Sequence, residues 1–272
     1  MLRIARLMIA ASGIALAMAP LSAEAAAPIG IVGAFSGDYS NSSYSGGGSH
    51  ADTWGLNGAG AFGLGMNDLA GQINGGYHRL SVSGADADIW DIGGSAYWAP
   101  GFGRAGASVA YTTANFGGSG SGIDAHATTY GVFGEYFLND AITVGAKGGG
   151  ADGKVNLSGF GSGSGSGGYV GGELTGYAMP DLALKGTIDY VDLSGGHLTS
   201  YGINAEYLFS EATPISLYGG YVRSDLSNNA GHVDTWMVGL KFYTGGPGSL
   251  VTHQRTETLG SIGTNSALRS AL

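Results

Sequence analysis

Three kinds of residue in this chain are chemically suggestive: six histidines, a small set of charged side chains, and many glycines in short repeats. The histidines have no spacing typical of a zinc site, and neither an H-E-x-x-H nor a G-x-S-x-G sequence occurs. Because the chain has no cysteine, disulfides and thiolate metal ligands are excluded. We therefore expect no enzyme activity, no metal and no cofactor. The histidines are His50, His78, His126, His197, His232 and His253.

Two glycine stretches, at residues 58–63 and 101–106, fit the G-x-G-x-x-G pattern of dinucleotide-binding loops. That mechanism requires the glycines to join a strand to the start of a helix, and neither stretch opens a helical pattern. The formal net charge of −9 and the lack of a basic cluster also exclude nucleic acid as an expected partner, because phosphate backbones repel an acidic chain. Any chemistry must therefore lie in how the secondary structure distributes polar and apolar side chains.

The first 25 residues have the features of a cleaved signal peptide. Arg3 and Arg6 precede an apolar run over residues 7–19, and Ala23-Glu24-Ala25 supplies a small-x-small cleavage site. The run is shorter than the ~20 residues that a spanning helix needs. We expect residues 1–25 to direct export and the mature chain to begin near Ala26.

The composition favours a β-protein in which glycines lie within strands. Glycine accounts for 54 of 272 residues, aromatic residues for 10% and charged residues for only 11%. A disordered chain would have few aromatic residues and many charges, and collagen would need a strict glycine period with abundant proline. No long apolar run follows residue 19, so a helical membrane protein is also excluded.

Apolar residues alternate with small or polar ones over segments of about ten residues, and turn sequences separate these segments. In a strand, the two alternating sets point to opposite faces. In the last segment, Trp236, Val238, Leu240 and Phe242 alternate with Thr235, Met237, Gly239 and Lys241.

Short turn sequences alternate along the chain with longer stretches rich in glycine, serine and asparagine. The short ones are residues 67–68, 100–101, 139–140, 180–181 and 211–214, and the longer ones are 39–51, 84–86, 117–122, 158–168, 194–196 and 227–231. Transmembrane barrels have short periplasmic turns and longer outer loops. We therefore predict an all-β fold, a transmembrane antiparallel up-and-down β-barrel over residues 26–244, with about twelve strands and ten as the alternative count.

Aromatic residues recur near both ends of the apolar faces, six to eight positions apart. That spacing spans roughly 20–26 Å along a strand. Because barrel strands are tilted, the distance along the membrane normal is a little less than the ~25 Å height of the apolar band. We predict an aromatic girdle at both lipid–water interfaces, the alternative being the aromatic core of a soluble sandwich. Its members are Trp54, Phe62, Trp90, Trp98, Tyr130, Tyr136, Tyr201, Phe209, Trp236 and Phe242.

The last strand, residues 233–243, combines alternating apolar residues with Gly239, Leu240, Phe242 and a final Tyr243. In this strand, and in its architecture over residues 29–243, the chain resembles the porin-like outer-membrane β-barrel proteins of Gram-negative bacteria. The resemblance implies location in the bacterial outer membrane, contact with its lipid, and recognition of the last strand by the barrel assembly machinery. In that family the aromatic residue is usually the last one. Here residues 245–272 follow, and we expect them to form a flexible periplasmic tail.

Charged residues of the strands fall on the face opposite the apolar one, where a barrel hides them from lipid. An arginine or lysine that faces the bilayer midplane costs about 2–4 kcal/mol. The candidate pore-lining residues are Asp91, Arg104, Glu135, Lys147, Glu173, Lys185, Asp189, Glu206 and Lys241.

Such an interior either conducts or is filled by its own salt bridges. We predict a porin-like passive pore for small hydrophilic solutes. The alternatives are a non-conducting structural or surface-interaction barrel of the outer membrane and, less favoured by the paired aromatic residues, a secreted soluble β-protein.

Overall fold

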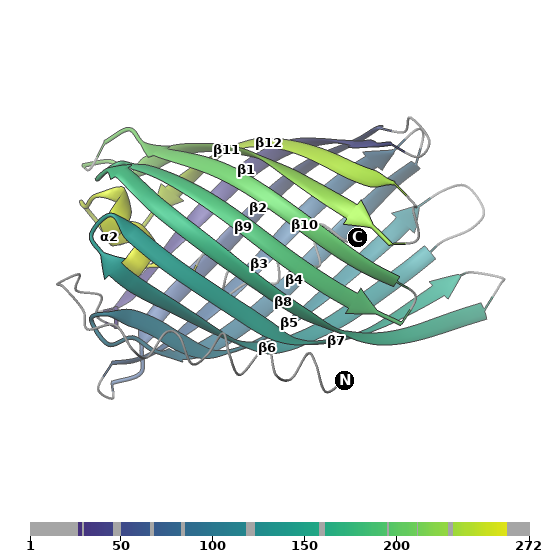
Figure 1. Ribbon diagram of the computed structural model, residues 1–272, viewed down its shortest axis with the longest axis horizontal. Coiled ribbons are helices and arrows are strands. Elements are labelled where there is room, and N and C mark those ends of the chain that lie inside the picture. The colour runs from purple at the N-terminus through teal and green to yellow at the C-terminus, as the bar shows by residue number, and fades with distance from the viewer. Residues whose placement is uncertain are drawn as a thin grey trace.

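The computed structural model describes residues 27–28, 30–45, 50–65, 68–82, 85–117, 123–157, 161–194, 196–210, 212–227 and 231–259. Within these ranges twelve strands form one closed antiparallel barrel, in which sequence neighbours pair and β1 closes on β12 (Figure 1). The predicted up-and-down barrel of twelve strands is confirmed, and the alternative count of ten is wrong. The strands are β1 Ile31–Tyr44, β2 His50–Gly63, β3 Leu69–Val82, β4 Ala85–Trp98, β5 Gly103–Gly117, β6 Ile123–Asn139, β7 Ile142–Leu157, β8 Gly161–Met179, β9 Leu182–Leu193, β10 Gly196–Leu208, β11 Ile215–Leu226 and β12 His232–Tyr243.

The predicted signal peptide, residues 1–25, lies outside the described residues. The helix α2, Leu250–Thr256, follows the last strand. Among the described residues, no helix is both long enough and apolar enough to cross a membrane.

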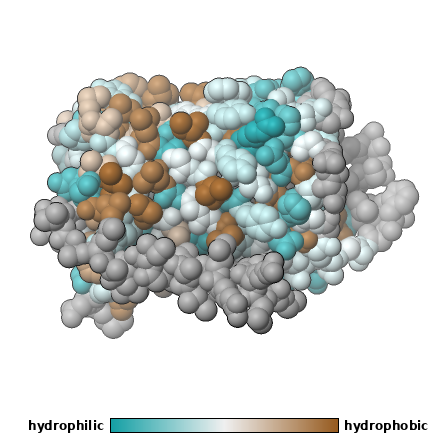
Figure 2. All heavy atoms as spheres, in the orientation of Figure 1, coloured by the Kyte–Doolittle hydropathy of each residue, from teal (hydrophilic) through white to brown (hydrophobic). Residues whose placement is uncertain are grey.

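The two-residue alternation of the sequence becomes two walls of different polarity. On β12, Trp236, Val238 and Leu240 are exposed on the outer wall, whereas Tyr243 is buried inside. In the view of Figure 2, apolar residues gather toward the end that holds α2, and hydrophilic residues are more frequent toward the opposite end. Because a closed barrel has only an outside and an inside, alternate residues of each strand face opposite walls.

The connections at the end near α2, the turn end, are short and stabilised by local side chains. Asn139 Oδ1 accepts a hydrogen bond from Ala141 N at 2.9 Å in the β6–β7 turn. Ser210 Oγ accepts one from Ala212 N at 3.2 Å in the β10–β11 connection. Asn and Ser side chains favour turns because they replace a backbone partner in this way. At the opposite end, which we call the loop end, β1 ends at Tyr44 and β2 begins at His50.

Two predicted loops are shorter than expected. β8 begins at Gly161, within the predicted loop 158–168, and pairs with β7 from there. β1 continues to Tyr44 where the sequence suggested a loop from residue 39. Tyr39 is in register with Trp54 of β2 and with Val238 of β12. Near the loop end, Ser42 Oγ and Thr235 Oγ1 are hydrogen-bonded at 2.8 Å. The serine and asparagine side chains that suggested a loop are compatible with a strand here, because cross-strand hydroxyl pairs stabilise a sheet.

The ten predicted girdle residues all lie on the outer wall, in two groups. Near the loop end, the Tyr77 ring centroid is 5.4 Å from that of Trp54 and 4.4 Å from that of Trp90. Near the turn end, Phe102 lies 6.0 Å from Trp98 and 6.1 Å from Tyr136. The rings in these contacts come from neighbouring strands or, for Phe102, from the β4–β5 connection, so the contacts run around the barrel and not along it.

Several glycines make room for an aromatic ring of the next strand. A Cβ at Gly239 would lie 2.5 Å from Cζ of Tyr218, and one at Gly149 would lie 2.8 Å from the Tyr169 hydroxyl. Both tyrosines therefore lie flat along the inner wall instead of projecting across the lumen. The abundance of glycine thus keeps side-chain volume out of the barrel interior.

We expect replacement of Gly239 by valine to destabilise the barrel by about 1–3 kcal/mol, the usual cost of overpacking. Gly186, on the outer face of β9, has nothing within 4 Å of its missing Cβ. Gly186→Val should therefore be neutral or slightly stabilising, because a β-branched residue suits a strand. Urea unfolding of the refolded variants measures both, and equal stabilities would contradict the packing role of Gly239.

Candidate functional site in the barrel lumen

After β12 the chain turns into the barrel at the turn end. Thr244 N donates to Gly33 O at 2.9 Å, and Ser249 then caps α2 by accepting a hydrogen bond from Thr252 N at 3.3 Å. We call residues 244–259 the C-terminal plug. Figure 1 shows its helix at the end of the barrel that holds the short turns.

Two leucines anchor the plug on different parts of the inner wall. Leu250 is 0% exposed and packs with Tyr177 and Tyr243, on β8 and β12. Leu259 is 1% exposed and packs with Tyr97 and Phe133, on β4 and β6. The plug therefore crosses the lumen from one part of the wall to another.

This arrangement differs from the flexible tail that the sequence suggested for residues 245–272. Residues 245–259 are docked, because buried leucines and many polar contacts hold them inside the barrel. The part of the predicted tail beyond residue 259 lies outside the described residues.

Arg255 fixes the plug to the β6–β7 turn. Its Nη2 donates to the carbonyl oxygens of Asn139 at 2.7 Å and Ile142 at 3.3 Å, and its Nε donates to Thr143 Oγ1 at 3.2 Å. The guanidinium also faces the ring of Phe137, 4.8 Å from its centroid. These partners are two carbonyl oxygens of the turn region, a hydroxyl and an inward ring, so one side chain holds the plug to the β6–β7 turn through several contacts.

Arg104 on the neighbouring strand β5 also holds the plug. It pairs with Glu135, directly opposite on β6, with Nη2 2.5 Å from Oε2. The same guanidinium donates to the plug carbonyls of Gln254 at 2.9 Å and Thr258 at 2.8 Å. Arg104 is only 4% exposed, so its hydrogen bonds are made away from bulk water.

All nine predicted lumenal residues point inward, and each lies in an ion pair or next to a histidine. Besides Arg104–Glu135, the pairs are Lys147–Asp189 at 3.0 Å, Lys185–Glu173 at 3.3 Å, Lys241–Glu206 at 2.8 Å, and Asp91 Oδ2 with His78 Nε2 at 3.9 Å. The two signs therefore balance locally along the wall.

The register explains one of these pairs. Lys147 on β7 and Asp189 on β9 are separated by Gly171 of β8, which is in register with both. A Cβ at Gly171 would lie 2.8 Å from Cε of Lys147. The missing side chain therefore lets the two charged groups meet across the middle strand.

A cavity of about 1270 Å³ occupies the lumen above the plug, and Thr258 of the plug belongs to its lining. Its side chains change with depth. Toward the plug lie Lys147 with Asp189, Lys185 with Glu173, and Lys241. Toward the loop end lies a set that we call the aliphatic mouth. The aliphatic mouth comprises Leu80, Val82, Ile89, Val191, Leu193, Leu198, Val222, Leu226 and Val233.

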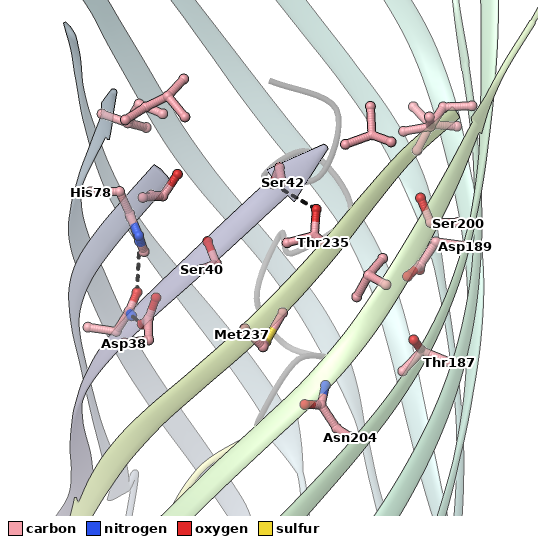
Figure 3. Close-up of a pocket in the computed structure, with 18 of the residues that line it drawn as sticks. Asp38, Ser40, Ser42, His78, Thr187, Asp189, Ser200, Asn204, Thr235 and Met237 are labelled. Carbon is pink, nitrogen blue, oxygen red and sulfur yellow. Dashed lines mark hydrogen bonds between the residues drawn. The ribbon is translucent and has the colours of Figure 1, made fainter. Parts of the chain in front are cut away.

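A neutral and acidic polar network lies between these two zones (Figure 3). Asp38 Oδ1 accepts hydrogen bonds from Asn57 Nδ2 at 2.9 Å and from the Tyr218 hydroxyl at 3.3 Å. Asn57 Oδ1 in turn lies 3.1 Å from His78 Nε2. Sequence reasoning missed this network, although the alternation of residues 36–42 with their apolar neighbours would have placed Asp38 on the inner face.

A smaller cavity of about 190 Å³ lies against the plug itself and is lined by Arg104, Glu135, Glu206, Gln254 and Arg255 among others. Gln254 Nε2 donates to Glu206 Oε2 at 3.0 Å. The plug therefore meets the charged part of the wall largely through hydrogen bonds, with space left beside them.

No protein-family model matches this chain, and no curated protein matches its sequence. Solved structures do resemble its fold. The translocator domain of the autotransporter NalP from Neisseria meningitidis superposes with a TM-score of 0.52 at 13% identity, over 88% of this chain and 94% of that one. An outer-membrane channel from Pseudomonas putida F1 gives a TM-score of 0.52 at 15% identity, over 84% of this chain and 100% of that one.

The fold is therefore that of the outer-membrane β-barrels, as the sequence predicted. Within that class, this chain combines twelve strands with a lumen that its own C-terminal segment enters.

Proposed function

We propose that this protein is an outer-membrane β-barrel that lets small hydrophilic solutes pass, and that the C-terminal plug closes the passage at the turn end. The observation that carries the proposal is the cavity of about 1270 Å³ bounded by the plug. The wall is a complete barrel without the plug, since β1 pairs with β12 along eleven register positions. Removal of the plug would therefore open the lumen without removing a strand.

Location in the outer membrane is supported by the outer wall. Aliphatic side chains such as Leu56, Ile92 and Ile203 are exposed there at 58–62%, and a soluble protein seldom exposes a contiguous apolar surface of this size. The two aromatic groups would then lie at the lipid interfaces. Cell fractionation, together with a heat-dependent shift in gel mobility, tests this. Recovery of a soluble periplasmic species would contradict it.

Assembly would follow the route of similar barrels, with the barrel assembly machinery recognising β12. That strand ends in Phe242 and Tyr243, and the Tyr243 ring stacks on His253 of the plug at a centroid distance of 4.7 Å. We infer that the machinery recognises the strand before the plug docks, because docking buries Tyr243.

A permanently closed barrel with a structural or surface-interaction role is the second candidate. The number of polar contacts that hold the plug favours it. Arg104 and Arg255 alone make five hydrogen bonds between the plug and the barrel, four to backbone oxygens and one to a hydroxyl. Single-channel recording separates the candidates. A barrel that shows no channel conductance either with or without the plug would have a structural role.

If ions pass through the lumen, Lys147→Glu and Lys185→Glu should each shift the reversal potential toward cation selectivity. Both lysines line the cavity, and a change of sign there alters the field that a passing ion meets. Lys154→Glu is the matched control, because Lys154 is exposed on β7 and does not line the cavity. The measurement is the reversal potential in a salt gradient, made on the chain without its plug. An equal shift in all three variants would exclude a pore-lining role for Lys147 and Lys185.

A further inference from the structure

The aliphatic mouth is unusual for a membrane barrel, whose interior is normally polar. Its residues lie on two sides of the lumen: Leu80, Val82 and Ile89 on β3 and β4, and the others on β9 to β12. Val191, Leu198 and Tyr169 form a buried cluster, against which Leu226 packs. An apolar group would gain roughly 25 cal/mol for each Å² that it buries against these side chains.

Asp38 lies deeper in the same cavity and has no basic side chain within 4 Å among the described residues. Its described partners are the amide of Asn57 and the hydroxyl of Tyr218. The other inward carboxylates of the strands differ in this respect, since each has a lysine, arginine or histidine partner. Asp38 is thus the lumenal carboxylate whose negative charge is least compensated by neighbouring basic side chains.

The register brings Asp38 and aliphatic side chains together. Asp38 is in register with Gly239 on β12 and with Gly55 on β2, neither of which carries a side chain. Two residues farther toward the loop end on β12 is Met237, which also lines the cavity (Figure 3). On the other side, Leu80 follows His78 at the next inward position of β3. A molecule held at Asp38 would therefore have Met237 and Leu80 beside it on the way to the mouth, together with the hydroxyls of Ser40 and Thr235.

We propose that the lumen binds organic ammonium ions that carry an apolar body, with the ammonium at Asp38 and the body against the aliphatic mouth. A carboxylate inside a cavity of low dielectric attracts a cation more strongly than one in bulk water, and the hydrophobic effect supplies the second half of the recognition. The proposal deepens the proposed function, because it names the class of solute that the passage prefers. Binding itself does not require passage.

Isothermal titration calorimetry on the full chain in lipid nanodiscs tests this, with empty nanodiscs to subtract partitioning into lipid. The probe is 4-phenylbutylammonium. Two companions each lack one feature: 4-phenylbutyrate has the opposite charge, and ethylammonium has no apolar body. We expect the probe to bind about tenfold more tightly than 4-phenylbutyrate, since a hydrogen bond to a charged group contributes at least that much. We expect a similar advantage over ethylammonium, which has no apolar body to bury.

Variants locate the site. Asp38→Asn should weaken binding of 4-phenylbutylammonium about tenfold and leave 4-phenylbutyrate unchanged or better bound, whereas Asp38→Glu should retain the preference for the cation. Val222→Thr should weaken binding of both aromatic probes, because it places a hydroxyl in the mouth. The control is Asp52→Asn. The Asp52 carboxylate lies on the outer wall, where it accepts a hydrogen bond from the Tyr39 hydroxyl at 2.5 Å.

Equal affinities of wild type and Asp38→Asn for the ammonium, or equal affinities of the two aromatic probes, would overturn the inference. If the ammonium binds as expected but the chain without its plug stays silent in bilayers, the proposed passage fails while the binding site stands. If that shortened chain conducts but binds both aromatic probes alike, the binding site fails while the passage stands.

Discussion

Deletion of residues 245–272 is expected to convert a closed barrel into a conducting one. The plug is held by buried Leu250 and Leu259 and by the hydrogen bonds of Arg104, Gln254 and Arg255. If these contacts favour the docked state by only about 3 kcal/mol in sum, the undocked state is populated less than about 1% of the time. The mean current in planar bilayers should therefore rise about a hundredfold or more on deletion.

A point variant serves the same test without shortening the chain. Leu250→Glu places a carboxylate among Ala34, Tyr177, Leu208 and Tyr243, so it should undock the plug and raise the current toward that of the deletion. Thr252→Glu is the matched control, because Thr252 is exposed on the same helix. A shortened chain that is as silent as the full one would refute the plug as the closing element.

Arg104→Ala is expected to be the most destabilising single substitution in the lumen. It leaves Glu135 buried without its cation, and breaking a buried pair in this way costs about 3–5 kcal/mol. It also removes both donors to the plug carbonyls of Gln254 and Thr258. The midpoint of urea unfolding, followed by the heat-dependent gel shift, measures the loss.

Two comparisons make that result specific. Arg79→Ala removes the ion pair with Asp86, in which Arg79 Nη2 lies 2.7 Å from Asp86 Oδ2 and both side chains are at least 43% exposed. Because the pair is exposed, its loss should lower the stability by less than about 1 kcal/mol. The double variant Arg104→Met/Glu135→Met should recover much of the stability, because it leaves no buried charge unpaired. If Arg104→Ala proved as mild as Arg79→Ala, the buried pair would have no structural role.

The barrel could be predicted from the sequence because alternation and turn sequences are local. The period of two assigns each residue to a wall, and this was enough to place Lys185 and Glu206 inside and Trp54 and Trp236 outside. The pairing of charges could not be predicted in the same way. Lys147 meets Asp189 only because β7, β8 and β9 adopt a particular register with Gly171 in the middle, and register depends on the closure of the whole barrel.

The plug was not predicted from the sequence, for a different reason. Residues 250–259 are too few and too polar to suggest a stable helix, and isolated helices of this length are marginal. A signal was nevertheless present: Ser249 is a favourable N-cap residue, and Leu250, His253 and Glu257 recur at helical spacing. The hydrogen-bond partners of Gln254, Thr258 and Leu259 belong to distant strands, so only the closed barrel supplies the surface on which this segment folds. These partners are Tyr177, Arg104 and Gln72.

The aliphatic mouth was missed because the expected division was between an apolar outside and a polar inside. Val191, Leu193 and Leu226 have inward positions near strand ends, where a loop makes the alternation harder to read. Polarity in this barrel varies with depth as well as from wall to wall, and depth follows from register and tilt.

The measurement that tests these ideas most directly is the accessibility of single cysteines, because the chain contains no cysteine of its own. We expect cysteines at Asn74, Ser200 and Asn204 to react with a hydrophilic maleimide that enters the lumen from the loop end. Cysteines at Ile73, Ile203 and Leu217 should react only with a lipid-soluble reagent, in native outer membranes. Reaction of both sets with the same reagent, or the reverse assignment, would contradict the division of the strands into a lumenal wall and a lipid-facing wall.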